Sequence, residues 1–224
     1  MSIGLERFRH IAVEGPIGVG KSTLAARLAK HLGAEPMLER PAENPFLQRF
    51  YADMPGYAFQ TQLFFLLQRW EQMQVLAQPS IFGAPVVSDF VFAKDAIFAR
   101  LNLSDEEHRL YRQMVAHLAL RVREPDLVIW LQAPTPTLLQ RIRRRAISME
   151  QGIAPDYLER LAEGYAAHFQ NYDGAPVFAV ATEHFNPAER EADFALLLDR
   201  LAAFHGLRGY LDVGGGGALT ERFV

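Results

Sequence analysis

The stretch GPIGVGKS at residues 15–22 has the spacing G-x-x-x-x-G-K-S, and the sequence on both sides suits that pattern. An apolar, β-branched run at 9–14 predicts a buried strand before it. Leucines at helical spacing over 22–32 predict a helix after it. A glycine-rich loop between a strand and a helix points its backbone N–H groups, and the positive end of the helix, at one place. The stretch therefore predicts a site for the phosphates of a nucleoside triphosphate.

Two side chains of this P-loop carry the predicted chemistry. We expect Lys21 to reach the outer phosphates and the Ser22 hydroxyl to ligate magnesium, so ATP and Mg²⁺ are the implied cofactors. A chance match in a glycine-containing turn is the alternative, and the flanking strand and helix argue against it. The predicted phosphate-site residues are Gly15, Ile17, Gly18, Val19, Gly20, Lys21, Ser22 and Thr23.

The composition is that of an ordinary globular chain, with 224 residues, 50% of them hydrophobic, and a net charge of −3. This length fits one α/β domain with a large core, and the weak charge points to no nucleic-acid or membrane partner. The absence of cysteine excludes disulfides, thiolate chemistry and cysteine metal sites. No apolar signal segment precedes the first strand, and no apolar run reaches the roughly 20 residues of a membrane helix. We expect a cytoplasmic protein.

Strand and helix patterns alternate along the chain, which predicts a doubly wound, five-stranded, mainly parallel sheet flanked by helices. One domain is expected over 1–208, and the glycine-rich segment 209–224 is expected to be a loose, flexible tail. Strands are predicted at 9–14, 35–39, 84–89, 126–131 and 177–180. Helices are predicted at 22–32, 46–51, 57–77, 92–101, 104–122, 135–145, 155–171 and 187–204.

Two carboxylates stand at predicted strand ends. Parallel sheets bind ligands at the carboxyl ends of their strands, so Glu39, Asp89 and the segment after Val180 should share one rim with the P-loop. Glu39 can take a proton from an attacking hydroxyl, or it can be a solvated glutamate paired with Arg40. Asp89 can hold magnesium through water or orient the acceptor hydroxyl, or it can cap the next helix.

The predicted helix 135–145 is strongly basic. Arg141, Arg143, Arg144 and Arg145 cannot all lie on one face of it, so some of them are simply solvated. Those that face the rim can act as a mobile lid that stabilises charge on a transferring phosphoryl group. With a P-loop in the same domain, we predict a basic lid here.

Together these segments resemble the deoxynucleoside kinase family over residues 8–205, and most of all the bacterial branch that acts on purine deoxynucleosides. The resemblance implies an ATP-dependent phosphorylation of the 5′-hydroxyl of a deoxynucleoside, and a homodimer to which the helices 57–77 and 110–120 could contribute. The similar segments are EGPIGVGKST (14–23), NPF (44–46), FY (50–51), YAFQTQ (57–62), FFL (64–66), RIRRR (141–145), EQGI (150–153) and PDYLERL (155–161).

The resemblance also implies roles for single residues. Glu39 would be the base that takes the 5′-hydroxyl proton, Tyr51 would touch the sugar and Gln60 would pair with the base edge. Glu183 and Phe185 would touch the adenine of the donor. The implied catalytic residues are Glu39, Lys21, Arg145 and Asp89, and the implied magnesium ligands are Ser22 and Asp89. The implied nucleoside contacts are Glu39, Tyr51, Phe59, Gln60, Asp89 and Glu150. The further implied donor contacts are Arg141, Arg145, Glu183 and Phe185.

The chain departs from the family pattern at two places. The family has an acidic residue and then Arg-Ser after the third strand, whereas this chain has Asp89 and then Phe90, so the arginine near the phosphates is missing. Ile147 occupies a lid position that is commonly arginine. Each loss would cost about 2–4 kcal/mol of transition-state stabilisation unless another cation, Lys94 or a lid arginine, replaces it.

Two other functions are compatible with the sequence. One is another small P-loop kinase, acting on a nucleoside monophosphate or a non-nucleotide metabolite. A monophosphate acceptor would need extra cations at the acceptor pocket, and Arg40, Arg49 and Arg69 are the nearby candidates. A nucleotide-binding partner protein that kept the fold and lost catalysis would fit the missing arginine. The presence of Glu39 and Lys21 argues against that second alternative.

Overall fold

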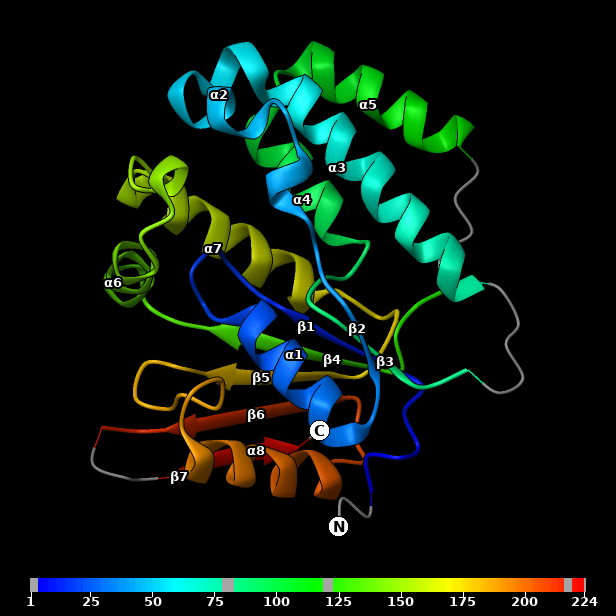
Figure 1. Ribbon diagram of the computed structural model, residues 1–224, viewed down its shortest axis with the longest axis vertical. Helices are drawn as coiled ribbons and strands as arrows, with labels where there is room; N and C mark the ends of the chain where they lie inside the picture. The colour runs from blue at the N-terminus through cyan, green and yellow to red at the C-terminus, as the bar shows by residue number, and fades with distance from the viewer. Residues whose placement is uncertain (1–3, 78–82, 119–122, 216–218, 224) are drawn as a thin grey trace.

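The computed structural model describes residues 4–77, 83–118, 123–215 and 219–223. Among these residues, seven strands form one sheet in the order β2-β3-β1-β4-β5-β6-β7 (Figure 1). All neighbouring strands are parallel except β6 and β7, which are antiparallel. The strands are β1 (His10–Glu14), β2 (Glu35–Met37), β3 (Val86–Ser88), β4 (Leu127–Gln132), β5 (Val177–Ala181), β6 (Arg208–Val213) and β7 (Leu219–Phe223).

Helices connect the parallel strands. Helix α1 packs against β1, β2 and β3, while α4 and α7 pack against each other. Helices α2, α3 and α5 lie at the top of Figure 1, farther from the sheet. The helices are α1 (Lys21–Leu32), α2 (Leu47–Ala52), α3 (Met54–Ala77), α4 (Lys94–Asn102), α5 (Asp105–His117), α6 (Thr135–Arg145), α7 (Pro155–Gln170) and α8 (Glu191–Ala203), with short 3₁₀ turns η1 (Pro41–Glu43) and η2 (Ser148–Glu150).

The main core lies along the central strands. All five residues of β1 are buried, and β4 and β5 are nearly as buried. Such near-continuous apolar strands are typical of parallel sheets that helices cover on both faces. The predicted α/β class with a mainly parallel sheet is confirmed, and this arrangement brings the ends of β1, β3 and β4 to one edge, where the P-loop begins.

The C-terminal segment differs from the prediction. The sheet has seven strands in the described residues instead of five, because β6 and β7 come from the segment 208–223, which includes most of the predicted loose tail. Glycines in this segment suggested looseness, but Gly209 packs tightly: a Cβ there would lie 2.4 Å from Cδ2 of Phe178. Leu211 is fully buried. Residues 216–218 and 224 of the predicted tail lie outside the described residues.

Other predicted bounds shift by a few residues. The second strand ends at Met37, and α3 begins three residues before the predicted start at 57. The predicted helix 104–122 corresponds to α5, which ends at His117. Residues 119–122 of that prediction lie outside the described residues. Within the described parts of the chain, no helix is long and apolar enough to cross a membrane.

Candidate active site

The P-loop joins β1 to α1 through glycines whose backbone conformations other residues rarely adopt. The φ angle is +148° at Gly15, +84° at Gly18 and +104° at Gly20. A Cβ at Gly15 would lie 2.4 Å from the carbonyl oxygen of Leu131, and a Cβ at Gly18 would lie 2.8 Å from Cγ1 of Ile142. Both torsion and close approach therefore require glycine, and the resulting loop can wrap an anion.

A cavity over this loop has the composition of a phosphate-donor site. It is lined by residues 18–23, by Arg141, Arg144 and Arg145 of α6, and by Asn186, Ala188 and Glu189 after β5. Arg141 donates to the carbonyl oxygen of Val19 at 3.1 Å and to Oγ1 of Thr182 at 3.0 Å, so it fastens the loop to the end of β5. The arginines give the cavity the positive charge that phosphates need.

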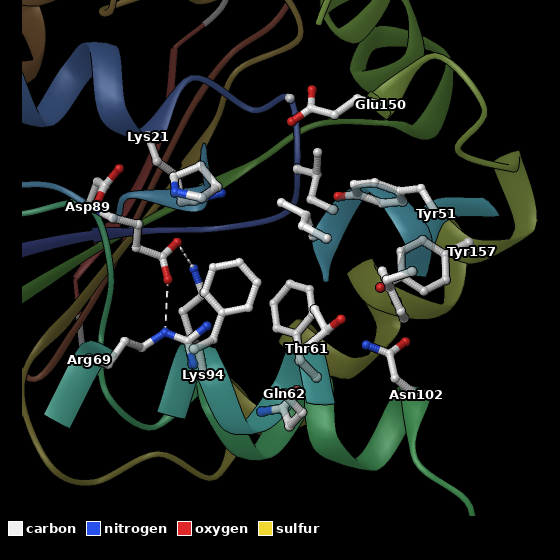
Figure 2. Close-up of a pocket in the computed structure, with 18 of the residues that line it drawn as sticks. Lys21, Tyr51, Thr61, Gln62, Arg69, Asp89, Lys94, Asn102, Glu150 and Tyr157 are labelled. Atoms are coloured by element: carbon white, nitrogen blue, oxygen red, sulfur yellow. Dashed lines mark hydrogen bonds and ion pairs between the residues drawn. The ribbon is translucent and has the colours of Figure 1, made fainter. Parts of the chain in front are cut away.

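A second cavity adjoins the first. Gly18, Lys21, Ser22 and Arg145 line both of them, and Figure 2 shows the second cavity with Lys21 and Asp89 at one end. A donor in the first cavity and an acceptor in the second would therefore meet at the P-loop. We call the two spaces the donor cavity and the acceptor cavity.

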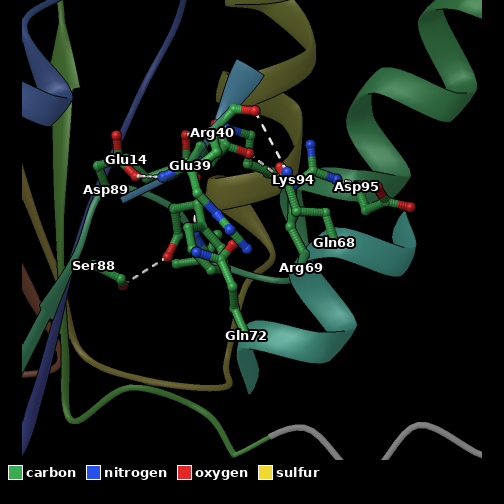
Figure 3. A network of polar contacts seen from close by, with 12 residues as sticks. Glu14, Glu39, Arg40, Gln68, Arg69, Gln72, Ser88, Asp89, Lys94 and Asp95 are labelled. Carbon is green, nitrogen blue, oxygen red and sulfur yellow. Dashed lines mark hydrogen bonds and ion pairs between the residues drawn. The ribbon is translucent and has the colours of Figure 1, made fainter. Parts of the chain in front are cut away.

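Glu39 lies in the acceptor cavity with a cation on each carboxylate oxygen. Nε of Arg69 donates to Oε1 at 2.8 Å, and Nζ of Lys94 donates to Oε2 at 2.7 Å (Figure 3). Burial favours the neutral acid, but the charges and hydrogen bonds of Lys94 and Arg69 outweigh it and lower the pKa of Glu39 to about 2. The group is therefore ionised at neutral pH. The simple pairing with Arg40 is not observed, because Arg40 pairs with Glu43 at 3.0 Å.

Asp89 connects Glu39 to the P-loop. Its Oδ1 accepts the backbone N–H of Glu39 at 2.7 Å, and its Oδ2 accepts the hydroxyl of Ser22. Burial, followed by the charge of Glu39, raises the pKa of Asp89. The two predicted magnesium ligands, Ser22 and Asp89, thus touch each other. Their hard oxygens fit Mg²⁺, which usually takes one or two protein oxygens together with phosphate and water.

Lys21 stands between the two cavities. Its Nζ donates to the carbonyl oxygen of Pro16 at 3.1 Å. Burial, and then the nearby charge of Lys94, lower the pKa of Lys21 to about 8. A triphosphate placed on the loop would add negative charge beside this ammonium and favour its protonated form.

The far end of the acceptor cavity combines aromatic walls with polar groups. Tyr51 and Glu150 line it, and Glu150 pairs with Arg145, which also lines this cavity. Thr61 is buried, and its Oγ1 has no hydrogen-bond partner among the described residues. Gln62 is also buried and donates from Nε2 to the backbone oxygen of Asp95 at 3.0 Å. The further lining side chains at this end are Phe50, Phe65, Phe98, Asn102 and Tyr157.

Comparison with known proteins identifies the family. The family model for "Deoxynucleoside kinase" matches residues 11–204. This chain belongs to the deoxynucleoside kinase family. It is 36% identical over 156 residues to a deoxyguanosine kinase of Bacillus subtilis, covering 69% of this chain and 75% of that one, and 33% identical over 189 residues to a deoxyadenosine kinase of Dictyostelium discoideum, covering 82% and 76%.

Solved structures agree with this assignment. The structure of deoxyadenosine kinase from M. mycoides with bound dATP has a TM-score of 0.73 and 28% sequence identity, and covers 86% of this chain and 98% of that one. The same enzyme with bound dCTP gives a TM-score of 0.73 and 28% identity over 87% of this chain and 100% of that one. The fold described above is therefore the fold of these kinases.

Two of the predicted nucleoside contacts, Gln60 and Phe59, lie outside the acceptor cavity of this family member. Gln60 is exposed, and Phe59 packs into the cluster of Leu66, Ala99 and Tyr111 instead of the acceptor cavity. Side chains of α3 that do line the cavity follow helical spacing, at Ala58, Thr61, Gln62, Phe65 and Arg69. At 100° per residue, Gln60 points about 200° away from Gln62. Gln62 lies three residues before Phe65 and seven before Arg69, which is the spacing of one helix face. This spacing is the signal by which the sequence could have identified Gln62 as the lining glutamine.

The two predicted adenine contacts of this kinase, Glu183 and Phe185, also lie outside the cavity expected for them. Phe185 is 1% exposed and belongs to the main core, and Glu183 lies beside His184 at 3.8 Å. Neither residue lines the donor cavity, whereas Asn186 and Glu189 of the same segment do. The family resemblance suggested Phe185 by its place after the last predicted strand, and here packing turns that side chain into the core.

Proposed function

We propose that this protein transfers the γ-phosphoryl group of ATP to the 5′-hydroxyl of a deoxynucleoside, with a purine deoxynucleoside favoured. The observation that carries the proposal is the carboxyl group of Glu39, paired with two cations, in a cavity that meets the phosphate loop at Lys21 and Ser22. A base beside the acceptor and cations beside the donor are what in-line phosphoryl transfer requires. The names of the relatives, which are deoxyguanosine and deoxyadenosine kinases, support the purine preference.

The proposed step moves one proton and one phosphoryl group. The hydroxyl proton passes to Glu39 as the 5′-oxygen attacks the γ-phosphorus and the bond to the leaving ADP breaks. Lys21 and the loop N–H groups hold the phosphates. Mg²⁺ would be held by Ser22 and Asp89 and would neutralise phosphate charge.

The nucleoside would lie along the acceptor cavity. We assign the sugar to Tyr51 and Glu150, and the base edge to Gln62 in place of Gln60. Arg145 pairs with Glu150 and lines both cavities, so donor binding that draws Arg145 toward phosphate would also affect the sugar site. The lid role of α6 is part of this proposal.

The cations of the acceptor cavity favour a nucleoside over a nucleoside monophosphate. Of the three candidate arginines, only Arg69 lines this cavity, and it is held between Glu39 and Asp95. Arg40 and Arg49 lie outside the lining. The phosphate of a monophosphate acceptor would therefore lie near the carboxylate of Glu39, and the cations beside that carboxylate are already engaged in ion pairs.

We propose a homodimer formed through α3 and α5, each of which exposes a large apolar side chain. Leu67 of α3 is 44% exposed, and Leu110 of α5 is 48% exposed. These two helices lie together at the top of Figure 1. A cytoplasmic location is also proposed, since ATP, the proposed donor, is available there.

The test is ADP formation from Mg-ATP with the four natural deoxynucleosides and their monophosphates as acceptors. We expect turnover with a purine deoxynucleoside, and a loss of about 10²–10⁴-fold in kcat for Glu39→Gln, which keeps the shape and removes the base. Glu43→Gln, in an exposed pair outside both cavities, is the matched control. Turnover with monophosphates alone would favour the monophosphate-kinase alternative, and ATP binding without any turnover would favour a silent partner protein.

A further inference from the structure

Phe90 occupies the position where the family pattern has an arginine near the phosphates. Its side chain is fully buried and lines neither cavity. Four residues later, Lys94 begins α4 and turns into the acceptor cavity, where it is 3% exposed. The site has thus lost a cation at one position and holds another that comes from the adjacent helix.

The ammonium of Lys94 lies between two carboxylates of different kinds. Nζ is 2.7 Å from Oε2 of Glu39 and 3.7 Å from Oε1 of Glu14 (Figure 3). Glu14 is 0% exposed and immobilised, since its oxygens accept the backbone N–H groups of Gly15 and Val91, each at 2.9 Å, and the hydroxyl of Tyr165 at 2.8 Å. Glu14 therefore remains beside Lys94 as a fixed counter-charge when Glu39 loses its own charge.

The other cations around Glu39 are less able to move to a phosphate. Arg69 is fixed by ion pairs to both Glu39 and Asp95. Lys21 belongs to the P-loop and serves the donor side. Lys94 has a flexible four-carbon stem and three rotatable donors, so it can change partners by a small displacement.

We propose that Lys94 does the work of the absent arginine: it pairs with Glu39 before transfer and binds the transferring phosphoryl group during transfer. This inference rests on the proposed function. As the proton moves from the 5′-hydroxyl to Glu39, an O–P bond forms to the γ-phosphorus and the bond from that phosphorus to ADP breaks. Glu39 becomes neutral, so the buried ammonium of Lys94 keeps only the more distant carboxylate of Glu14. A buried charge whose pairing is weakened in this way is costly. Lys94 therefore shifts its attraction to the equatorial oxygens of the phosphoryl group, where charge is concentrated in the transition state.

The test is steady-state kinetics of Lys94→Met, Lys94→Arg and the double variant Phe90→Arg/Lys94→Met. Lys94→Met keeps the length of the side chain and removes its charge, and we expect it to lower kcat about 10²–10³-fold. The KM for the deoxynucleoside should change far less, because the interaction is made mainly in the transition state. Lys94→Arg, and the double variant that restores the family arginine, should each recover at least about tenfold of the lost kcat.

Lys30→Met is the matched control, because Lys30 is the one further lysine of the sequence and lies exposed on α1. Thermal unfolding of every variant separates misfolding from loss of catalysis. Wild-type kcat in Lys94→Met overturns the inference while leaving the proposed function intact. A folded Lys94→Met that loses kcat without recovery in either arginine variant also overturns it, because restoring a positive charge would then not restore catalysis. A wild-type chain without turnover overturns both.

Discussion

Replacing Arg69 by methionine removes a charge that two buried carboxylates share. Arg69 is 3% exposed, pairs with Glu39 through Nε at 2.8 Å and with Asp95 through a second nitrogen, and lies over the ring of Phe65 at 5.3 Å. Removing one partner of a buried ion pair typically costs about 3–5 kcal/mol, because the other charge stays buried. For a chain of this size, that corresponds to a fall in Tm of about 10 °C.

The assay is urea and thermal unfolding of Arg69→Met beside Arg40→Met. Arg40 pairs with Glu43 at the surface, with 52% and 50% of the two side chains exposed, so its loss should cost less than about 1 kcal/mol. The double variant Arg69→Met/Asp95→Asn should be less destabilised than the sum of the single variants, with a coupling energy of about 1–3 kcal/mol. Equal stability of Arg69→Met and Arg40→Met would refute the reasoning.

Three further predictions concern the two cavities and the sheet. Gln62→Ala should raise the KM for the deoxynucleoside about tenfold, whereas the exposed Gln60→Ala should not. Arg145→Met should lower kcat about 10²-fold and raise the KM for ATP, while Arg143→Met, exposed on the same helix, leaves both unchanged in the same assay. His10 has its pKa lowered from 6.5 to about 4 by burial, so the unfolded chain binds more protons between these values. Urea unfolding should show stability falling by about 3 kcal/mol from pH 6.5 to 4, and His10→Gln should flatten that fall.

The parts of the account that sequence could predict are those whose signals are local. The strand, glycine loop and helix at the P-loop are contiguous, so their order specifies both the element types and the phosphate site. The loop itself favours glycine at Gly15 and Gly18, because each has a positive φ and a Cβ there would meet neighbouring atoms. The strand-end positions of Glu39 and Asp89 follow from the same logic, because parallel strands end at one edge.

The polar network around Glu39 could not be predicted in the same way. Its partners Arg69 and Lys94 follow Glu39 in the sequence by 30 and 55 residues, on two different helices. Neighbourhood in sequence suggested Arg40, whereas packing of α3 and α4 decides the observed pairs. The C-terminal strands were missed for a related reason, since Gly209 reflects contact with Phe178, which no local pattern reveals.

The central claim is that a phosphoryl group moves from ATP to the 5′-oxygen of a deoxynucleoside, and following the label of [γ-³²P]ATP tests it most directly. The protein should convert deoxyguanosine or deoxyadenosine to a labelled product that co-migrates with the 5′-monophosphate and loses its label to a 5′-nucleotidase. Glu39→Gln at the same concentration should give at least about 10²-fold less of that product than the wild-type protein. Label that stays in ATP with every deoxynucleoside, or that appears only in diphosphates made from added monophosphates, would contradict the account.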